Sequence, residues 1–101
     1  MKRIILVTGG FDPIHGGHIK YIQEAKKVDP ESPLCVGLNS EEWLIRKKGK
    51  YFMTFDERKE VLSAIKDVDL VIPFIDDDNS ACDAIDMCLQ IYDLVIFCNG
   101  C

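Results

Sequence analysis

Residues 9–18 read GGFDPIHGGH and stand between an aliphatic run and a segment with helical spacing. The aliphatic run occupies residues 4–7 and is followed by Thr8, whereas residues 19–28 place apolar side chains at intervals of roughly 3.6 residues. This order predicts a buried strand, a glycine-rich turn and the first turn of a helix. Such a junction gathers backbone N–H groups and the positive end of a helix dipole in one small volume, which favours a phosphate.

The composition of the chain limits its size class and its partners. Its 101 residues are enough for one small domain with a single core. The formal net charge of −5 argues against a nucleic-acid partner, although residues 46–50 form a basic cluster that predicts a local anion site. No apolar stretch reaches the roughly 20 residues of a membrane span, and no signal peptide is visible. The odd number of cysteines, five, indicates reduced thiols and a cytoplasmic location.

Apolar periodicity and turn signals divide the chain into alternating strands and helices. Strands are expected at residues 2–8, 34–38, 70–74 and 94–98. Helices are expected over residues 17–28 and 41–48, after a capping box at residues 54–57, and after a cap at residues 79–80. The third helix should bury Phe55, Val61, Leu62 and Ile65. The fourth should bury Ala81, Ile85, Cys88, Leu89 and Tyr92.

Four strand–helix alternations predict an α/β fold, with an open parallel sheet, helices on both faces and one domain over residues 1–101. Ligands of such sheets bind beyond the carboxyl ends of the strands. The glycine-rich turn, Asn39, the loop after Phe74 and the pair Asn99 and Gly100 all follow expected strands. We therefore expect them to converge on one crevice. The acidic residues 76–78 are interpreted as a solvated run rather than a metal cluster.

His15 and His18 have the clearest chemistry in the turn. Imidazole N–H groups can donate to phosphate oxygens, and more strongly as negative charge develops there, which suits substitution at phosphorus. The glycines between them leave room for close approach. The turn holds no nucleophile, which argues against a covalent phospho-enzyme. Two independent surface histidines are the plain alternative, and a zinc site would need further ligands that the sequence does not supply.

Two blocks of the sequence resemble one known family. Residues 9–18 are similar to the G-x-F-D-x-x-H-x-G-H signature of the cytidylyltransferase-like nucleotidyltransferase superfamily. Residues 54–73, TFDERKEVLSAIKDVDLVIP, resemble the E-R-x-x-x-L-x-A-I-x-x-V-D-x-V-I-P region of its glycerol-phosphate and heptose-phosphate branches. The lysine-rich stretch between the blocks is similar too. The resemblance covers nearly the whole chain and implies a Rossmann-like fold.

The resemblance also implies roles for individual residues. Catalysis would involve His15, His18 and Lys47. The nucleotide would be bound by residues of the turn, by lysines and by the end of the fourth strand: Gly9, Gly10, Phe11, Asp12, His15, Gly17, His18, Lys48, Lys50, Asn99 and Gly100. Arg58 and Asn39 would support the site, the alternative for Arg58 being a place on a helix surface. Asp12 is expected to make an Asx-type turn bond, the alternative being help with Mg2+. Trp43 is expected to pack beneath its helix, the alternative being stacking on a base.

The activity implied by the resemblance is nucleotide transfer. A phosphorylated small-molecule acceptor would attack the α-phosphorus of CTP or ATP and take up CMP or AMP. Pyrophosphate would leave, and Mg2+ would be bound with the triphosphate. The alternative is a non-catalytic nucleotide-binding module that keeps the phosphate cradle. An NAD-dependent oxidoreductase is disfavoured, since it needs a G-x-G-x-x-G turn and an acidic residue where this chain has Asn39.

The family's pattern continues beyond the fourth strand with a segment that closes over the triphosphate. That segment is not present in this sequence. We therefore expect either a domain shortened at its C-terminus or a weakly active one. The choice between CTP and ATP, the acceptor and the oligomeric state stay open, with a homodimer as one option. Neither a nucleic acid nor a membrane is an expected partner.

Overall fold

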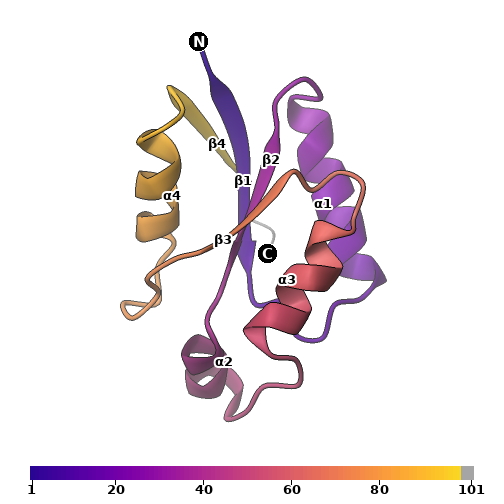
Figure 1. Ribbon diagram of the computed structural model, residues 1–101, viewed down its shortest axis with the longest axis vertical. Coiled ribbons are helices and arrows are strands. Elements are labelled where there is room, and N and C mark those ends of the chain that lie inside the picture. The colour runs from indigo at the N-terminus through magenta and orange to yellow at the C-terminus, as the bar shows by residue number, and fades with distance from the viewer. Residues whose placement is uncertain (99–101) are drawn as a thin grey trace.

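The computed structural model describes residues 1–98 and contains a four-stranded parallel sheet covered by helices (Figure 1). In chain order the elements are β1 (Arg3–Gly9), α1 (Gly16–Val28), β2 (Leu34–Leu38), α2 (Glu41–Lys48), α3 (Phe55–Ser63), β3 (Leu70–Pro73), α4 (Cys82–Leu89) and β4 (Leu94–Cys98). The expected α/β fold with a parallel sheet is confirmed. Within these residues, no helix has the length and apolar character that a membrane crossing requires.

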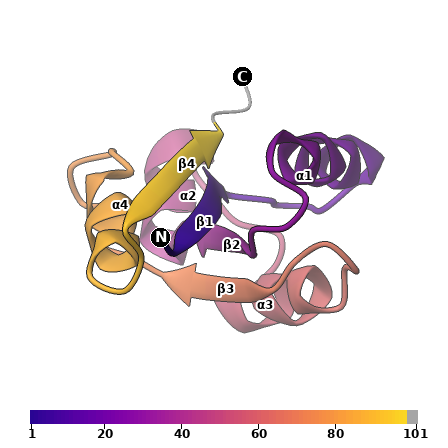
Figure 2. The same cartoon turned by 90° about the horizontal axis from the view of Figure 1, so that it is seen from above.

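Helices lie on both faces of the sheet (Figure 2). On one face, Ile5 of β1 belongs to the same buried cluster as Ile22 of α1 and Leu62 of α3. On the other face, Leu6 of β1 shares a cluster with Ala84 of α4. Successive side chains of a strand point to opposite faces, so β1 contributes to both clusters and reads as a continuous aliphatic run.

The strand order places a crevice at the carboxyl end of β1. The sheet has the order β3-β2-β1-β4, so the chain leaves β1 toward β2 and β3 and later crosses to the opposite side to form β4. Ligands of open α/β sheets bind outside the carboxyl ends of the strands at such a switch point. Since the glycine-rich turn follows β1 directly, it lies at this point.

Local hydrogen bonds explain where three of the helices begin. His15 is the N-cap of α1, and its side chain accepts a hydrogen bond from Gly17 N–H. Ser40 caps α2 in the same way. Thr54 and Glu57 form the capping box that the sequence predicts for α3. These caps are read from residues within one helical turn, and for that reason the sequence locates them well.

Three details of the sequence expectation are wrong. Val61 is 43% exposed, because Arg58 and Leu62, four residues apart, occupy the buried face of α3 instead. Leu89 is 49% exposed at the last residue of α4. The residue before α4 is Ala81, and it makes no side-chain capping bond.

Asp76 also departs from expectation, because it is buried rather than solvated. It is 3% exposed, and its carboxylate accepts hydrogen bonds from Asn39 Nδ2 at 3.0 Å and from Ser40 N–H and Oγ at 2.8 Å each. Burial alone would raise the pKa of Asp76, but the bonds from Ser40 and Asn39 and the charge of Arg46 outweigh it and lower the pKa. Asp76 thereby ties the loop after β3 to the start of α2.

Arg58 joins three loops at the carboxyl end of the sheet. Its side chain is fully buried, and Nη1 donates to the carbonyl oxygens of Gly10 at 2.9 Å and Asn39 at 2.7 Å. Its Nε donates to the Met53 carbonyl at 3.2 Å. These three carbonyls belong to the turns after β1 and β2 and to the loop before α3. The alternative that Arg58 lies on a helix surface is therefore wrong.

We predict that Arg58→Ala lowers the free energy of unfolding by at least about 3 kcal/mol. The change leaves three carbonyl groups without their donor, and each unsatisfied buried group costs about 1–3 kcal/mol. Urea unfolding measures the loss. Lys59→Ala is the matched control, because Lys59 is exposed on the same helix and should change stability by less than about 0.5 kcal/mol. Equal stability of the two variants would contradict the role given to Arg58.

Candidate functional site

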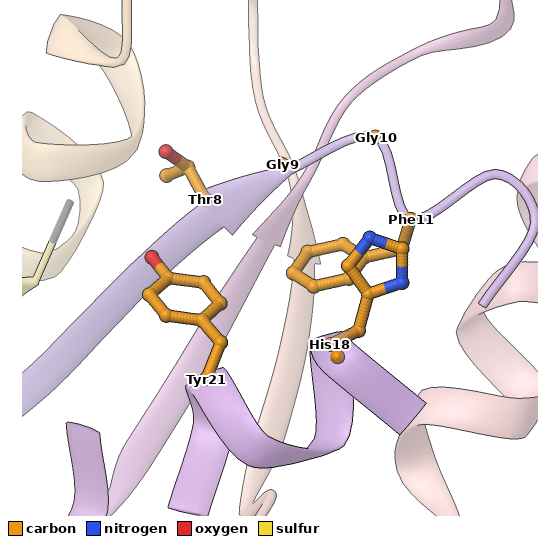
Figure 3. Close-up of a pocket in the computed structure, with 7 residues that line it drawn as sticks. Thr8, Gly9, Gly10, Phe11, His18 and Tyr21 are labelled. Carbon is orange, nitrogen blue, oxygen red and sulfur yellow. The ribbon is translucent and has the colours of Figure 1, made fainter. Parts of the chain in front are cut away.

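The turn after β1 folds around the ring of Phe11 (Figure 3). Phe11 has a φ of 51°, in the left-handed region that residues other than glycine seldom adopt, and is only 4% exposed. Its ring meets the ring of His18 edge to face, with 5.0 Å between centroids. Backbone strain of this kind persists where surrounding packing holds it, and it is common at ligand sites.

A pocket of about 310 Å³ opens beside the Phe11 ring, between β1 and α1 (Figure 3). Its lining consists of Thr8, Gly9, Gly10, Phe11, Gly17, His18 and Tyr21. The Tyr21 hydroxyl donates to the Cys98 carbonyl at 2.6 Å, which joins this wall to the end of β4. Most of the predicted nucleotide-binding residues of the turn therefore lie around one pocket.

The rings of His15 and His18 both accept backbone hydrogen bonds at the start of α1. Nδ1 of His15 accepts from Gly17 N–H at 3.0 Å, and Nδ1 of His18 accepts from His15 N–H at 3.2 Å. The two rings stack, with 3.9 Å between centroids and 23° between planes. The pair is thus a capping box built from two imidazoles rather than two independent histidines.

Burial and the neighbouring His15 ring favour the neutral form of His18. Burial lowers the pKa of His18 below the 6.5 of an unperturbed histidine, and the neighbouring His15 lowers it further. A neutral ring is also what the capping geometry needs, since Nδ1 can accept a hydrogen bond only when it carries no proton.

A second pocket of about 380 Å³ brings the histidines and two lysines together. It is lined by His15 and His18, by Lys47 and Lys48, and by Phe11, Trp43 and other residues. Phe11 and His18 line both pockets, so the two form one continuous cleft along the turn. The structure thus brings Lys47 to the same cleft as the two histidines.

The three lysines named from the sequence occupy different places. Lys47 Nζ lies 5.6 Å from the centroid of the Trp43 ring, beside the second pocket. Lys48 Nζ donates to the Asp12 carbonyl oxygen at 2.5 Å. Lys50 Nζ lies 5.1 Å from the Phe52 ring and does not line either pocket.

Asp12 anchors the loop before α3 instead of forming an Asx-type turn bond, so that expectation is wrong. Its carboxylate accepts from Phe52 N–H and Met53 N–H at 2.7 Å each, and its side chain is fully buried. Burial alone would raise the pKa of Asp12, but these bonds and the charge of Lys48 outweigh it and lower the pKa. The partners lie about 40 residues further along the chain, beyond the reach of any local turn pattern.

The remaining predicted residues support the turn or fall outside the described part. Asn39 N–H donates to the Gly9 carbonyl at 3.0 Å, and the Asn39 carbonyl accepts from Arg58. Asn39 and Arg58 therefore both stabilise the turn, because Asn39 binds the Gly9 carbonyl and Arg58 binds the Gly10 carbonyl. Asn99 and Gly100 lie outside the described residues. Within residues 1–98, no group of three or more His, Cys, Asp or Glu side chains is placed to hold a metal ion.

Sequence reasoning missed two residues of the cleft, Thr8 and Tyr21. Thr8 ends the aliphatic run, and its place at the carboxyl end of a strand is the signal that could have identified it. Tyr21 follows His18 by three residues, which puts both on one face of α1. Trp43, for which the sequence favoured packing beneath its helix over stacking on a base, is half-buried and lines the second pocket as well as a third one near β3.

Comparison with known proteins groups this chain with nucleotidyltransferase-type sequences. A family model described as cytidylyltransferase-like matches residues 6–92. Bifunctional protein HldE of Sulfurimonas denitrificans is 40% identical over 78 residues, which are 75% of this chain and 16% of that protein. The HldE of Blochmanniella pennsylvanica is 37% identical over 81 residues, or 78% of this chain and 17% of that protein. The chain thus spans a small part of the length of these relatives.

A solved structure extends the likeness to three dimensions. The crystal structure of the lipopolysaccharide core biosynthesis protein from Thermoplasma volcanium matches with a TM-score of 0.69 and 28% identity, over 94% of this chain and 72% of that chain. The residues matched by the family model include the turn with both histidines and the block from Thr54 to Pro73. On these grounds the chain belongs to the cytidylyltransferase-like family and has its Rossmann-like fold.

Proposed function

We propose that this domain transfers CMP or AMP from CTP or ATP to a phosphorylated small-molecule acceptor, with release of pyrophosphate. Membership of the cytidylyltransferase-like family supports this class of reaction. The observation that carries the proposal is that backbone N–H groups bind Nδ1 of both His15 and His18 beside a cleft that also contains Lys47 and Lys48.

The backbone hydrogen bonds to Nδ1 determine which imidazole nitrogen carries the proton. Nδ1 of each ring accepts a backbone N–H, so each neutral ring must hold its proton on Nε2. The pair therefore presents two Nε2–H donors whose orientation is set by the helix start. Donors held in place before the reaction are the arrangement that stabilises developing charge most effectively.

The reaction needs such donors around the α-phosphorus. An oxygen of the acceptor phosphate forms a bond to this phosphorus, and the bond from it to the bridging oxygen of the β-phosphate breaks, so that pyrophosphate departs. His15 and His18 would donate to the α-phosphate oxygens, while Lys47 and Lys48 would balance the negative charge of the remaining phosphates. The pocket beside Phe11 would hold the nucleoside part. Positioning and electrostatics supply most of the catalysis in transfers at phosphorus.

Mg2+ is proposed to enter with the triphosphate as part of the substrate. The Asp12 carboxylate is engaged by two backbone N–H groups and Lys48, so it is poorly suited to serve as a metal ligand. Mg2+ commonly binds through substrate phosphates and retains several waters. A cytoplasmic location is supported by the free thiols of Cys35, Cys82, Cys88 and Cys98.

Nuclear magnetic resonance should show both histidines as Nε2–H tautomers. We further expect His18 to titrate below pH 6.5, the value of an unperturbed histidine. Because the folded state disfavours protonated His18, this group's contribution to stability is present above pH 6.5 and is lost as the pH falls through the folded pKa. Long-range 15N–1H spectra recorded against pH measure the tautomer and the midpoint together. A proton on Nδ1 of either neutral ring would contradict the capping geometry.

Two kinds of substitution distinguish the loss of the Nε2 donor from the loss of the capping bond at Nδ1. In His15→Asn or His18→Asn, Oδ1 replaces Nδ1 as acceptor and the Nε2 donor is lost, so turnover should fall about a hundredfold to a thousandfold. Nucleotide affinity should change far less, because the donors act mainly on the transition state. His18→Gln keeps a donor near the Nε2 position and loses the cap, so it should lose about 1 kcal/mol of stability and less activity.

Pyrophosphate release with CTP or ATP and a panel of phosphorylated acceptors measures these rates. Nucleotide binding with no turnover for any acceptor would favour the non-catalytic binding module. Unchanged turnover in both Asn variants would contradict the role of the histidines.

Gly17→Ala should lower turnover by at least about tenfold, because it displaces the His15 ring and with it the Nε2 donor. A Cβ at Gly17 would lie 2.9 Å from Cε1 and 3.1 Å from Nδ1 of His15, so the ring would have to leave its place. Gly16→Ala is the matched control, because a Cβ there meets no protein atom within 4 Å. Pyrophosphate release compares the turnover of the two variants. Equal turnover would contradict a role for the position of the His15 ring in catalysis.

A further inference from the structure

Cys35 and Cys88 form a pair of buried thiols away from the cleft. Cys35 is the second residue of β2 and is fully buried, and Cys88 lies near the end of α4 and is 5% exposed. Both belong to the buried cluster between α4 and the sheet. Neither residue lines the cleft, so the proposed transfer reaction leaves the pair without a role.

The backbones of α4 and β2 approach each other closely at Gly37. A Cβ placed on Gly37 would lie 3.3 Å from the Cβ of Ala84, which is a buried residue of α4. The two Cβ atoms of a disulfide lie about 3.5–4.5 Å apart. At Gly37 and Ala84 the helix and the strand are therefore as close together as a disulfide requires.

The same close approach extends to the two cysteines. α4 runs against the direction of β2 (Figure 1). Cys35 precedes Gly37 by two residues, and Cys88 follows Ala84 by four. Two residues of a strand span about 6.6 Å and four residues of a helix about 6 Å, so the two steps match and place Cys88 opposite Cys35. In agreement with this geometry, a side-chain hydrogen bond joins the two thiols.

The hydrogen bond gives the two sulfur atoms different roles. Burial and the neighbouring Cys88 raise the pKa of the Cys35 thiol to about 12, so Cys35 keeps its proton and donates it to the bond. Burial also raises the pKa of Cys88, but the bond from Cys35 opposes this rise. Since the thiolate is the form that attacks a disulfide, Cys88 is the attacking sulfur and Cys35 the resolving one.

The attachment of α4 allows the local opening that a reagent needs to reach Cys88. α4 has eight residues, and its N-cap, Ala81, makes no side-chain hydrogen bond, whereas α1, α2 and α3 are all capped by side chains. It lies on the face of the sheet opposite to α1 and α3 (Figure 2). Its buried residues are the small Ala84 and Cys88. An element held by few buried side chains opens more readily than the core strands.

We propose that Cys35 and Cys88 are a reversible redox pair. They are free thiols in a reducing environment, and a low-molecular-weight disulfide such as oxidised glutathione converts them to a disulfide that joins α4 to the centre of the sheet. The attachment of α4 then depends on the redox state of its surroundings. The pair is independent of the proposed transfer of a nucleotide, so its failure in the tests below would leave that proposal untouched.

The reaction takes two exchange steps. The Cys88 thiolate attacks one sulfur of oxidised glutathione, the S–S bond of glutathione breaks, and one glutathione leaves. The Cys35 sulfur then attacks the Cys88 sulfur of the mixed disulfide, and the second glutathione leaves. The protons of the two protein thiols pass to the two glutathione molecules, so the pair loses two electrons and the oxidant gains them.

The first test identifies the bond by peptide mapping of the whole chain. The protein is equilibrated with mixtures of reduced and oxidised glutathione, quenched with acid, alkylated, and cleaved with trypsin and Asp-N protease. These cleavages place the cysteines on separate peptides: Cys35 on residues 29–46, Cys82 on 78–82, Cys88 on 86–92, and Cys98 with Cys101 on 93–101. We expect residues 29–46 to be linked to residues 86–92. Disulfides confined to the other three cysteines would overturn the proposal.

The second test measures what the bond does to the fold. Oxidation should raise the melting temperature by at least about 5 °C, because the bond closes a long loop of the unfolded chain. It should also slow hydrogen exchange of the α4 amides. Cys82→Ser is the matched control and should keep both effects, because Cys82 is exposed on the same helix.

Cys88→Ala should lose both effects of oxidation. Cys88→Ser, which has nearly the shape of cysteine, serves as a second variant if Cys88→Ala does not fold. A rise in melting temperature that is as large without the Cys88 sulfur as with it would contradict the pairing. So would a linked protein whose α4 amides exchange as fast as in the reduced form.

Discussion

The arrangement of the cleft depends on one buried cation. Arg58 comes from α3, yet its guanidinium binds carbonyl oxygens of Gly10, Asn39 and Met53. These oxygens belong to three different segments, and bringing them to one point helps to fix the relative positions of the turn, α2 and the loop before α3. A planar group with several donors in a fixed fork can do this, whereas a lysine offers a single flexible ammonium. Burial of the charge is tolerated because oriented carbonyl dipoles surround it.

The turn uses its backbone donors differently from a simple phosphate loop. At the start of α1, the N–H groups of His15 and Gly17 bind imidazole nitrogens, and that of His18 binds the His15 carbonyl. The donors expected to meet a phosphate directly are therefore engaged within the protein. These backbone hydrogen bonds fix the two rings, and the free donors of the turn are then the Nε2–H groups, which lie further from the backbone. This explains why the motif needs histidines at both positions and a glycine where the His15 ring lies.

The sequence predicts the parts of this structure that rest on local signals. The strands β2 and β4, the capping box of α3 and the end of α2 at Gly49 follow from periodicity and from residues within one turn. The two histidines could be identified in the same way. The roles of Arg58, Asp12 and Asp76 could not, because their partners lie between 5 and 48 residues away and are set by how the strands align. A charged residue in a helix or an acidic run reads as solvated until the tertiary contacts that bury it are known.

The loop between β3 and α4 has a consequence for how such a domain can diversify. Asp76 and Arg46 attach it to α2, whereas the histidine turn is attached through Arg58 and Asp12 to other segments. The two attachments share Asn39 but otherwise use separate residues. Substitutions in this loop can therefore accumulate without moving the imidazoles. In evolutionary terms, the fold allows the sequence of this loop to diverge while the geometry of the two imidazoles is inherited unchanged.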